Sequence, residues 1–338
     1  MKKVVVLTLH GYTNYGNRLQ LFALTRTLKT LYFDVMVYRH WRWKTLLKEF
    51  LRYYTVLRLK YRKECKLKSF TKKYIPRLVG GGSVDYSIVG SDQVWNPNWL
   101  KGFPYLLDVP FNGRKISYAA SIGVENLSNE QKTLFRANLC DFDFVSVREN
   151  SARVALQSLT SKEIEVVLDP TLLLDKSDYA GIEKKPKDIR DGEKYILCYI
   201  LGNREHLSAI QKYAEENNCR VILFSDKKES DYGVEEFLYL IHHAELICTD
   251  SFHACVFSFI FERPFVAFRR TGEADYMYSR LQNLIDTFKL KDREFNGRSI
   301  TEKNIKVDYT EAKEILKKER EKSLQFLKNA LGVKDEGR

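Results

Sequence analysis

Short runs of β-branched and aliphatic residues alternate with segments of helical periodicity along the chain, and this alternation constrains the fold most. Residues 4–9 are mostly apolar and β-branched, which predicts a buried strand, and leucines then recur at helical spacing from Leu19 to Leu28. Because strands separated by helices pair in parallel, the pattern predicts an α/β chain with parallel sheets.

The same pattern sets the expected elements and domains. A stretch rich in Lys, Asp and Gly at residues 175–193 interrupts the alternation, and we interpret it as a linker. The expected organisation is two Rossmann-like domains facing a cleft, at residues 1–175 and 194–310, with a helix over 311–338 that can pack back on the first domain. Further strands are expected at residues 35–38, 86–89, 116–120, 144–147, 166–168, 195–200, 220–224, 244–248 and 264–268. Helices are expected at 41–74, 128–139, 204–217, 234–242, 251–261, 276–286 and 311–331.

Composition excludes several classes of protein. Of 338 residues, 44% are hydrophobic, with 20 Phe, 20 Tyr and 4 Trp, so the chain can build a core and is not disordered or collagen-like. No apolar run is long enough for a transmembrane helix, and the apolar N-terminal stretch is too short for an export signal, so we expect a cytoplasmic protein. The six cysteines lack C-x-x-C spacing, and among the histidines only His242 and His243 are adjacent, so no metal is expected.

The whole net charge of +12 lies in one segment. Residues 39–77 contain 14 Lys and Arg and two acidic residues, interleaved with aromatic residues. Three interpretations stay open for this helical insertion: a solvated hairpin whose aromatic residues pack on the domain, a helix on an anionic membrane face, and a nucleic-acid groove. We expect no nucleic-acid partner, whereas association with the inner face of the plasma membrane remains an alternative.

Two loops after predicted strands carry polar residues suited to ligand binding. Asn14, Tyr15, Gly16 and Asn17 stand between the first strand and the first helix, where open α/β sheets bind ligands at a helix N-terminus. The loop is neither a G-x-G-x-x-G motif nor a P-loop, and a simple Gly/Asn turn is the alternative.

After the strand at 86–89, Ser91, Asp92 and Gln93 suit hydrogen bonding to sugar hydroxyls, and Trp95 can stack on a sugar face. The alternative for Ser91 and Asp92 is helix capping.

Charged residues at later strand ends complete the candidate site. Arg148 closes the strand at 144–147 and can bind a carboxylate or phosphate through its bidentate fork, or pair with Glu149. Asp250 and Ser251 precede an apolar helix, and His253 in its first turn suits general acid/base work. Arg269 and Arg270 follow the strand at 264–268 and can hold an anion at the same rim.

Six short motifs, in order, resemble the polysaccharide pyruvyl transferase family. They are G-Y-T-N-Y-G-N at 11–17, G-S-D-Q-V-W-N at 90–96, Y-A-A-S-I-G at 118–123, S-V-R-E at 146–149, L-D-P-T at 168–171 and T-D-S-F-H at 249–253. The resemblance implies a fold similar to two-domain GT-B glycosyltransferases, and transfer of the pyruvyl group of phosphoenolpyruvate to a sugar as a ketal, with release of phosphate. It also implies that Arg148, His253 and a later basic residue, either Arg269 or Arg270, act at the donor site, with no other cofactor.

We therefore hypothesise that His253 acts as acid/base and Arg148 holds the donor, while Asn14, Asp92, Gln93 and Trp95 face donor or acceptor. The expected acceptor is a lipid-linked oligosaccharide of a surface polysaccharide. Two alternatives remain: a GT-B glycosyltransferase that uses a nucleotide sugar, and a non-enzymatic membrane- or nucleic-acid-binding protein that uses residues 39–77.

Overall fold

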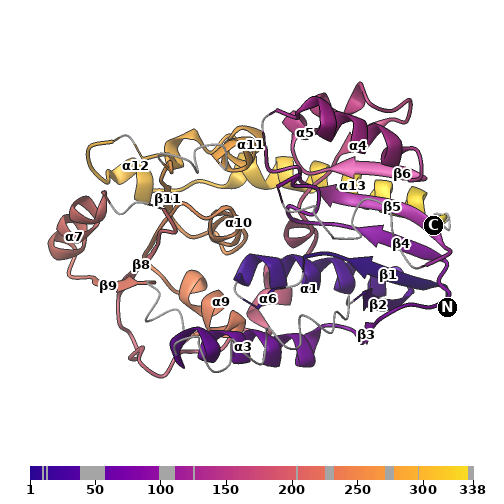
Figure 1. Cartoon of the computed structure of the whole chain (residues 1–338). Helices are drawn as coiled ribbons and strands as arrows, with labels where there is room; N and C mark the ends of the chain where they lie inside the picture. Colours follow the sequence, from indigo (N-terminus) through magenta and orange to yellow (C-terminus); the bar gives the residue numbers. More distant parts are fainter. Residues whose placement is uncertain are drawn as a thin grey trace.

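We describe the fold from a computed structural model, which places residues 1–9, 11–12, 14–38, 58–98, 111–124, 126–202, 205–224, 232–270, 278–295 and 297–333. Two α/β halves lie side by side, each built around one sheet (Figure 1). Every strand pair in these residues is parallel. The predicted architecture of two parallel-sheet, Rossmann-like halves is confirmed.

The N-terminal half contains a seven-stranded sheet in the order β3-β2-β1-β4-β5-β6-β7. Its strands are β1 (Lys3–Leu7), β2 (Asp34–Tyr38), β3 (Leu78–Val79), β4 (Tyr86–Val89), β5 (Arg114–Ala120), β6 (Phe144–Val147) and β7 (Ile164–Val166). The chain builds outward from β1 to β3 and then returns to the other side of β1. The sheet therefore has a topological switch point between β1 and β4, which is where open α/β sheets form a ligand crevice.

Helices cover both faces of this sheet, as the burial of β1 shows. Val4 and Val6 pack in the cluster that contains the apolar residues of α1 (Tyr15–Thr30), whereas Val5 and Leu7 pack with residues of α4 (Asn129–Leu139) and α5 (Asn150–Gln157). Successive strand residues point to opposite faces, so a strand buried on both sides must be apolar throughout.

The C-terminal half contains a four-stranded sheet in the order β11-β10-β8-β9. Its strands are β8 (Tyr195–Tyr199), β9 (Arg220–Leu223), β10 (Leu246–Thr249) and β11 (Phe265–Ala267). The accompanying helices are α7 (Leu207–Glu216), α9 (Val234–His242), α10 (Phe252–Ile260), α11 (Tyr278–Thr287), η3 (Lys291–Arg293) and α12 (Glu302–Ile305). In Figure 1, α9 and α10 lie between the four-stranded sheet and α1.

Two segments join the halves. After β7 the chain forms η1 (Pro170–Leu173) and α6 (Lys176–Ala180), so the predicted linker contains a short helix. The last helix, α13 (Thr310–Leu331), runs from the C-terminal half across to the seven-stranded sheet (Figure 1). There Ser323 Oγ accepts a hydrogen bond of 2.9 Å from Leu168 N, and Tyr86 donates one of 2.6 Å to the carbonyl of Leu331. Thus α13 lies against the N-terminal half.

The basic insertion is described only from residue 58 onward, and its first part, 39–57, lies outside the described residues. Helix α3 (Arg58–Tyr74) packs Phe70 against Phe22 of α1, with ring centres 6.0 Å apart, and Lys73 pairs with Glu235 of α9 at 3.5 Å. The interpretation in which apolar residues of this segment pack on the domain therefore fits α3. Among the helices described, none combines the length and apolar character that crossing a membrane requires.

Candidate functional site

The switch point of the seven-stranded sheet brings two of the predicted loops together. Asn17, in the first turn of α1, donates through Nδ2 to Asp92 Oδ2 at 3.1 Å, which links the loop after β1 to the loop after β4. Asn14 is the N-cap of α1, and its side chain accepts from the backbone N–H of Asn17 at 3.1 Å. Asn14 thus satisfies a free helix donor, and its φ of −123° is not the positive φ for which Asn is favoured in a simple turn.

Asp169, just beyond β7, is the centre of the site. Arg148, which follows β6, donates through Nη1 to Asp169 Oδ2 at 2.7 Å. The other carboxylate oxygen, Oδ1, accepts a hydrogen bond from Thr171 N at 3.0 Å. Ser91 Oγ donates to Oδ2 at 3.3 Å. Burial by itself raises the pKa of this carboxyl, but His253 and Arg148 outweigh that effect and hold the pKa well below its usual range. Asp169 is therefore ionised and holds Arg148 in place.

His253, in the first turn of α10, approaches the same carboxylate from the C-terminal half. Its Nε2 lies 3.7 Å from Asp169 Oδ2, which is longer than a hydrogen bond, and this buried nitrogen has no hydrogen-bond partner among the described residues. The ring also packs on Gly16 of α1, where an added Cβ would come within 2.0 Å of Nδ1. The structure therefore brings Gly16, His253 and Arg148 together, as the sequence predicts.

Asp92 adds a second buried carboxylate. It has φ of +73°, a left-handed conformation that is uncommon outside glycine and costs free energy. Burial alone would raise the pKa of the Asp92 carboxyl. The charges of Arg148, His253 and Arg280 lower this pKa by a larger amount, so the net shift is downward. Asp92 is thus ionised beside the three basic groups.

Arg280, on α11, is the basic residue of the site that sequence reasoning missed. Burial and the repulsion of Arg148 lower its pKa to about 10, so it stays charged at neutral pH. The Gln93 amide lies 2.8 and 3.1 Å from its two terminal nitrogens, with the amide oxygen toward the guanidinium in the orientation that satisfies both groups. Arg280 lies inside a predicted helix, follows no predicted strand and belongs to none of the six motifs. Its place in the site is visible only from the tertiary structure.

Three of the site residues, Arg148, Asp169 and Arg280, border a cavity of about 420 Å³ between the halves. Its walls include Arg148, Asp169, Phe252 and Arg280, and also Lys322 from α13. The Arg148 guanidinium stacks on Phe252, with Cζ 4.7 Å from the ring centre. Three buried guanidinium nitrogens at this place, Nε and Nη2 of Arg148 and Nε of Arg280, have no hydrogen-bond partner among the described residues. Buried donors without partners suit an anionic ligand.

Comparison with known families decides the relationship. The profile of the family described as polysaccharide pyruvyl transferase matches residues 14–272, well over half of the chain. The chain belongs to the polysaccharide pyruvyl transferase family. Membership supports a transferase, and all six motifs that carry the resemblance lie in or beside the matched region.

Solved structures give only distant matches. UDP-GlcNAc 2-epimerase from Neisseria meningitidis is 13% identical, covers 98% of this chain and 98% of its own, and has a TM-score of 0.49. The ADP-heptose LPS heptosyltransferase II of E. coli is 11% identical over 95% of this chain and 99% of its own, with a TM-score of 0.36. An uncharacterised Klebsiella pneumoniae protein is 12% identical over 82% and 87%, with a TM-score of 0.46. A comparison with curated proteins gives no significant match.

In this pyruvyl transferase family member, the predicted site residues that follow strands β10 and β11 are arranged differently from the expectation. Asp250 accepts from the backbone N–H groups of Leu201 and Gly202 at 2.8 and 2.7 Å, and Arg270 Nε lies 3.0 Å from the same carboxylate. Ser251 is the N-cap of α10 without a side-chain capping bond. Arg270 therefore holds Asp250 and the strand-end loop, whereas Arg269 is exposed. The guanidinium beside Arg148 belongs to Arg280. Donor contact by Arg269 or Arg270 stays a prediction.

Two aromatic candidates are core residues. Trp95 is fully buried against Phe135 and Phe142, with ring centres 6.1 and 5.6 Å away, so it has no face for a sugar. Tyr15 stacks on Phe237 of the C-terminal half at 4.8 Å, and its hydroxyl donates to the Tyr232 carbonyl. Both predictions of ligand contact are wrong for the same reason: each ring fills a core formed by segments distant in sequence.

Proposed function

We propose that this chain transfers the pyruvyl group of phosphoenolpyruvate to two hydroxyls of a sugar, which forms a ketal and releases phosphate. The observation that carries the proposal is the pair of arginines at one cavity, the buried Arg148 and the partly buried Arg280, whose guanidinium groups keep buried nitrogens without a hydrogen-bond partner among the described residues. A small donor with a carboxylate and a phosphate has two anionic groups for two such forks. Family membership supports the transferase class.

His253 is the proposed acid/base. In the reaction a proton adds to the methylene carbon of the donor, which makes C2 electrophilic, and a sugar hydroxyl attacks C2. The C2–O bond to phosphate breaks, and a second hydroxyl closes the ketal. The two hydroxyl protons balance the proton on the new methyl group and the proton taken up by phosphate. Asp169, 3.7 Å from His253 Nε2, would stabilise the imidazolium between these steps.

Phosphate release from phosphoenolpyruvate, measured with a panel of lipid-linked and aryl glycosides, tests the proposal directly. We expect acceptor-dependent release and a product whose mass exceeds that of the acceptor by one pyruvyl ketal. Release that does not depend on any acceptor, or no turnover with the whole panel while a nucleotide sugar is consumed, would contradict it.

Variants of the site separate the residue roles. Arg280→Gln removes one guanidinium and should raise the KM for phosphoenolpyruvate by about 10-fold or more, since a hydrogen bond to a charged group is worth about 1.5–3 kcal/mol. His253→Ala should lower kcat by about 10²–10⁴-fold while the protein stays folded. The matched control is Arg136→Gln, an exposed arginine on α4, which should leave both constants unchanged.

A nucleotide-sugar glycosyltransferase is the alternative, and one contact argues against it. In the C-terminal sheet the switch point lies between β8 and β10. In nucleotide-binding sheets, backbone N–H groups at such a point commonly bind the phosphates. Here Asp250 already accepts from two of those groups, at Leu201 and Gly202. A diphosphate would have to displace a carboxylate held by Arg270. Binding of a UDP- or GDP-sugar in preference to phosphoenolpyruvate would reverse this argument.

The acceptor we propose is a lipid-linked oligosaccharide of a capsule or exopolysaccharide, because such chains are assembled on membrane carriers. A peripheral association with an anionic membrane would bring the enzyme to this acceptor. Support comes from α3, which exposes Arg62, Lys68 and Lys72.

A further inference from the structure

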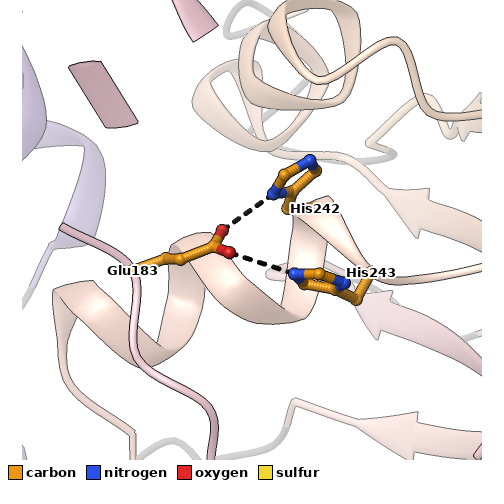
Figure 2. Close-up of side chains that lie close together, drawn as sticks. All are labelled: Glu183, His242 and His243. Atoms are coloured by element: carbon orange, nitrogen blue, oxygen red, sulfur yellow. Dashed lines mark hydrogen bonds and ion pairs between the residues drawn. The ribbon is translucent and has the colours of Figure 1, made fainter. Parts of the chain in front are cut away.

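Two histidines and one glutamate form a cluster away from the cavity (Figure 2). His242 Nδ1 lies 2.8 Å from Glu183 Oε2, and His243 Nε2 lies 3.0 Å from Glu183 Oε1. His242 is the last residue of α9 and His243 is its C-cap, whereas Glu183 belongs to the segment after α6. One ligand atom from each of the three residues lies within 4.8 Å of the other two.

The end of α9 makes this convergence possible. Consecutive side chains inside an α-helix point about 100° apart and do not meet. His243 has left the helix, with φ of −108° and ψ of 2°, so its ring can turn to the same side as that of His242. Each ring is also held by stacking: His242 lies on Phe261 at 4.3 Å, and His243 lies on Tyr239 at 4.1 Å between ring centres. Both rings are therefore oriented before any ligand arrives.

We propose that Glu183, His242 and His243 bind a divalent transition-metal ion, with Zn²⁺ as the probe. Two imidazole nitrogens and one carboxylate oxygen form a donor set that zinc accepts, with water in the fourth position. In a tetrahedral site the ligand atoms lie about 3.3 Å apart, so the three side chains need to move by little more than 1 Å. Their present hydrogen bonds would be exchanged for bonds to the metal.

Burial around the cluster agrees with this proposal. The side chain of His242 is only 15% exposed, so a bound ion would be partly shielded from solvent. The side chain of His243 is 39% exposed and that of Glu183 17%, so an ion can enter from solvent. Lys176 is the cation that faces His242 and weakens the attraction for a metal.

A metal here would add a link between two segments that are already in contact. Lys184 N already donates to the Glu235 carbonyl at 3.0 Å, which ties the chain after Glu183 to α9. A bound ion would fix the segment between α6 and β8 to the C-terminal half. The site lies outside the proposed donor cavity, so it is independent of the proposed function.

Zinc titration of the metal-free full chain by calorimetry tests the site. We expect one Zn²⁺ per chain and a higher Tm in its presence. Glu183→Gln keeps the hydrogen bonds to both rings but removes the charge, and His243→Gln removes one nitrogen ligand. Each should weaken zinc binding by at least about 10-fold. The control His206→Gln, whose ring stacks on Phe268 away from the cluster, should bind as the wild type does.

The exposed thiols of Cys65 and Cys140 are competing zinc ligands, so the titration is run in a Cys65→Ser, Cys140→Ser background. Co²⁺ substitution gives a second measurement, because nitrogen and oxygen ligands produce no thiolate-to-cobalt charge-transfer band. Stoichiometric binding without that band, and lost in the Glu183 variant, supports the site. No binding by the wild type, or binding unchanged in Glu183→Gln and His243→Gln, would overturn it.

Discussion

At the scale of single residues, Gly16 and His253 lie against each other across the site. Because a Cβ at position 16 would come within 2.0 Å of His253 Nδ1, Gly16→Ala must displace the imidazole. A shift of about 1 Å at a reacting group can cost about 100-fold in rate, so we expect kcat to fall by about that factor. Steady-state phosphate release measures this.

The matched control is Gly181→Ala. An added Cβ there would meet only the Ser177 carbonyl, at 3.3 Å, so activity should be kept. Full activity in Gly16→Ala, with an unchanged Tm, would show that the position of the His253 ring does not matter for turnover.

The buried pair of Asp169 and Arg148 makes a prediction about stability. Asp169→Asn removes the nearest carboxylate from Arg148 and leaves Glu149, at 3.7 Å, and Asp92 to offset its charge, which should lower the free energy of unfolding by up to about 3–5 kcal/mol. Since the pKa of Asp169 is lower in the folded state than in the unfolded chain, its contribution is present above about pH 4 and is lost as the pH falls through the folded-state value.

Urea unfolding of wild type and variant at neutral and acid pH measures both effects. The difference between them should shrink as the solution becomes more acid. The exposed pair of Glu302 and Lys306 provides the control, because Glu302→Gln should change stability by less than about 0.5 kcal/mol. Equal stability of Asp169→Asn and wild type would mean that Asp169 does not compensate Arg148.

The positions of site residues could be predicted from the sequence where the signal is local. Arg148 follows a strand and His253 begins a helix, and both positions are readable from the pattern. The aromatic rings of Tyr15 and Trp95 are a different case, because whether a ring meets a ligand or a core depends on segments far away in the chain. Arg280 was missed for the same reason: its neighbours, Arg148 and Gln93, lie on the other half.

At the scale of elements, α3 offers a test of membrane association. Replacing its exposed Arg62, Lys68 and Lys72 by Gln should weaken binding to anionic liposomes by about 1 kcal/mol per charge. Liposome co-sedimentation at several salt concentrations measures the loss, since attraction to the lipid surface is screened by salt.

The control removes the same charge elsewhere, with Lys303, Lys317 and Lys318 changed to Gln. If both triple variants bind liposomes equally, α3 has no special role. Pyruvyl transfer to an aryl glycoside, which needs no membrane, should be unchanged in both variants.

Most element boundaries were predictable because they depend on nearby residues. The strand at 144–147 and the helix at 234–242 have the predicted bounds. By contrast, the two-residue β3 was not expected, because only its pairing with β2 makes Leu78–Val79 a strand. The strand predicted at 166–168 instead ends at Val166, where pairing with β6 stops.

At the scale of the whole molecule, Tyr15 joins the halves through an aromatic cluster. Its ring packs on Tyr199, Phe224 and Phe237 of the C-terminal half. Tyr15→Ala should therefore cost about 3–5 kcal/mol of stability. Calorimetry should show one unfolding transition in the wild type, because the shared core couples the halves.

Tyr15→Phe is the companion variant. It keeps the ring and loses the hydrogen bond to the Tyr232 carbonyl, so the cost should be about 1 kcal/mol. Two separate transitions in the wild type, or equal effects of the two variants, would contradict a cooperative interface.

The sequence predicts that two halves exist but not how they meet. Contact between His253 of one half and Asp169 of the other depends on the relative orientation of the sheets, for which neither periodicity nor motif spacing carries a signal. The same holds for α13, which places Glu319 and Lys322 on the cavity wall.

The division of the site between the halves has a mechanical consequence. The imidazole of His253 belongs to one half, whereas Asp169 and Gly16 belong to the other, so any rotation that widened the gap would separate the ring from both. In the proposed mechanism, opening for exchange of ligands would then also stop proton transfer.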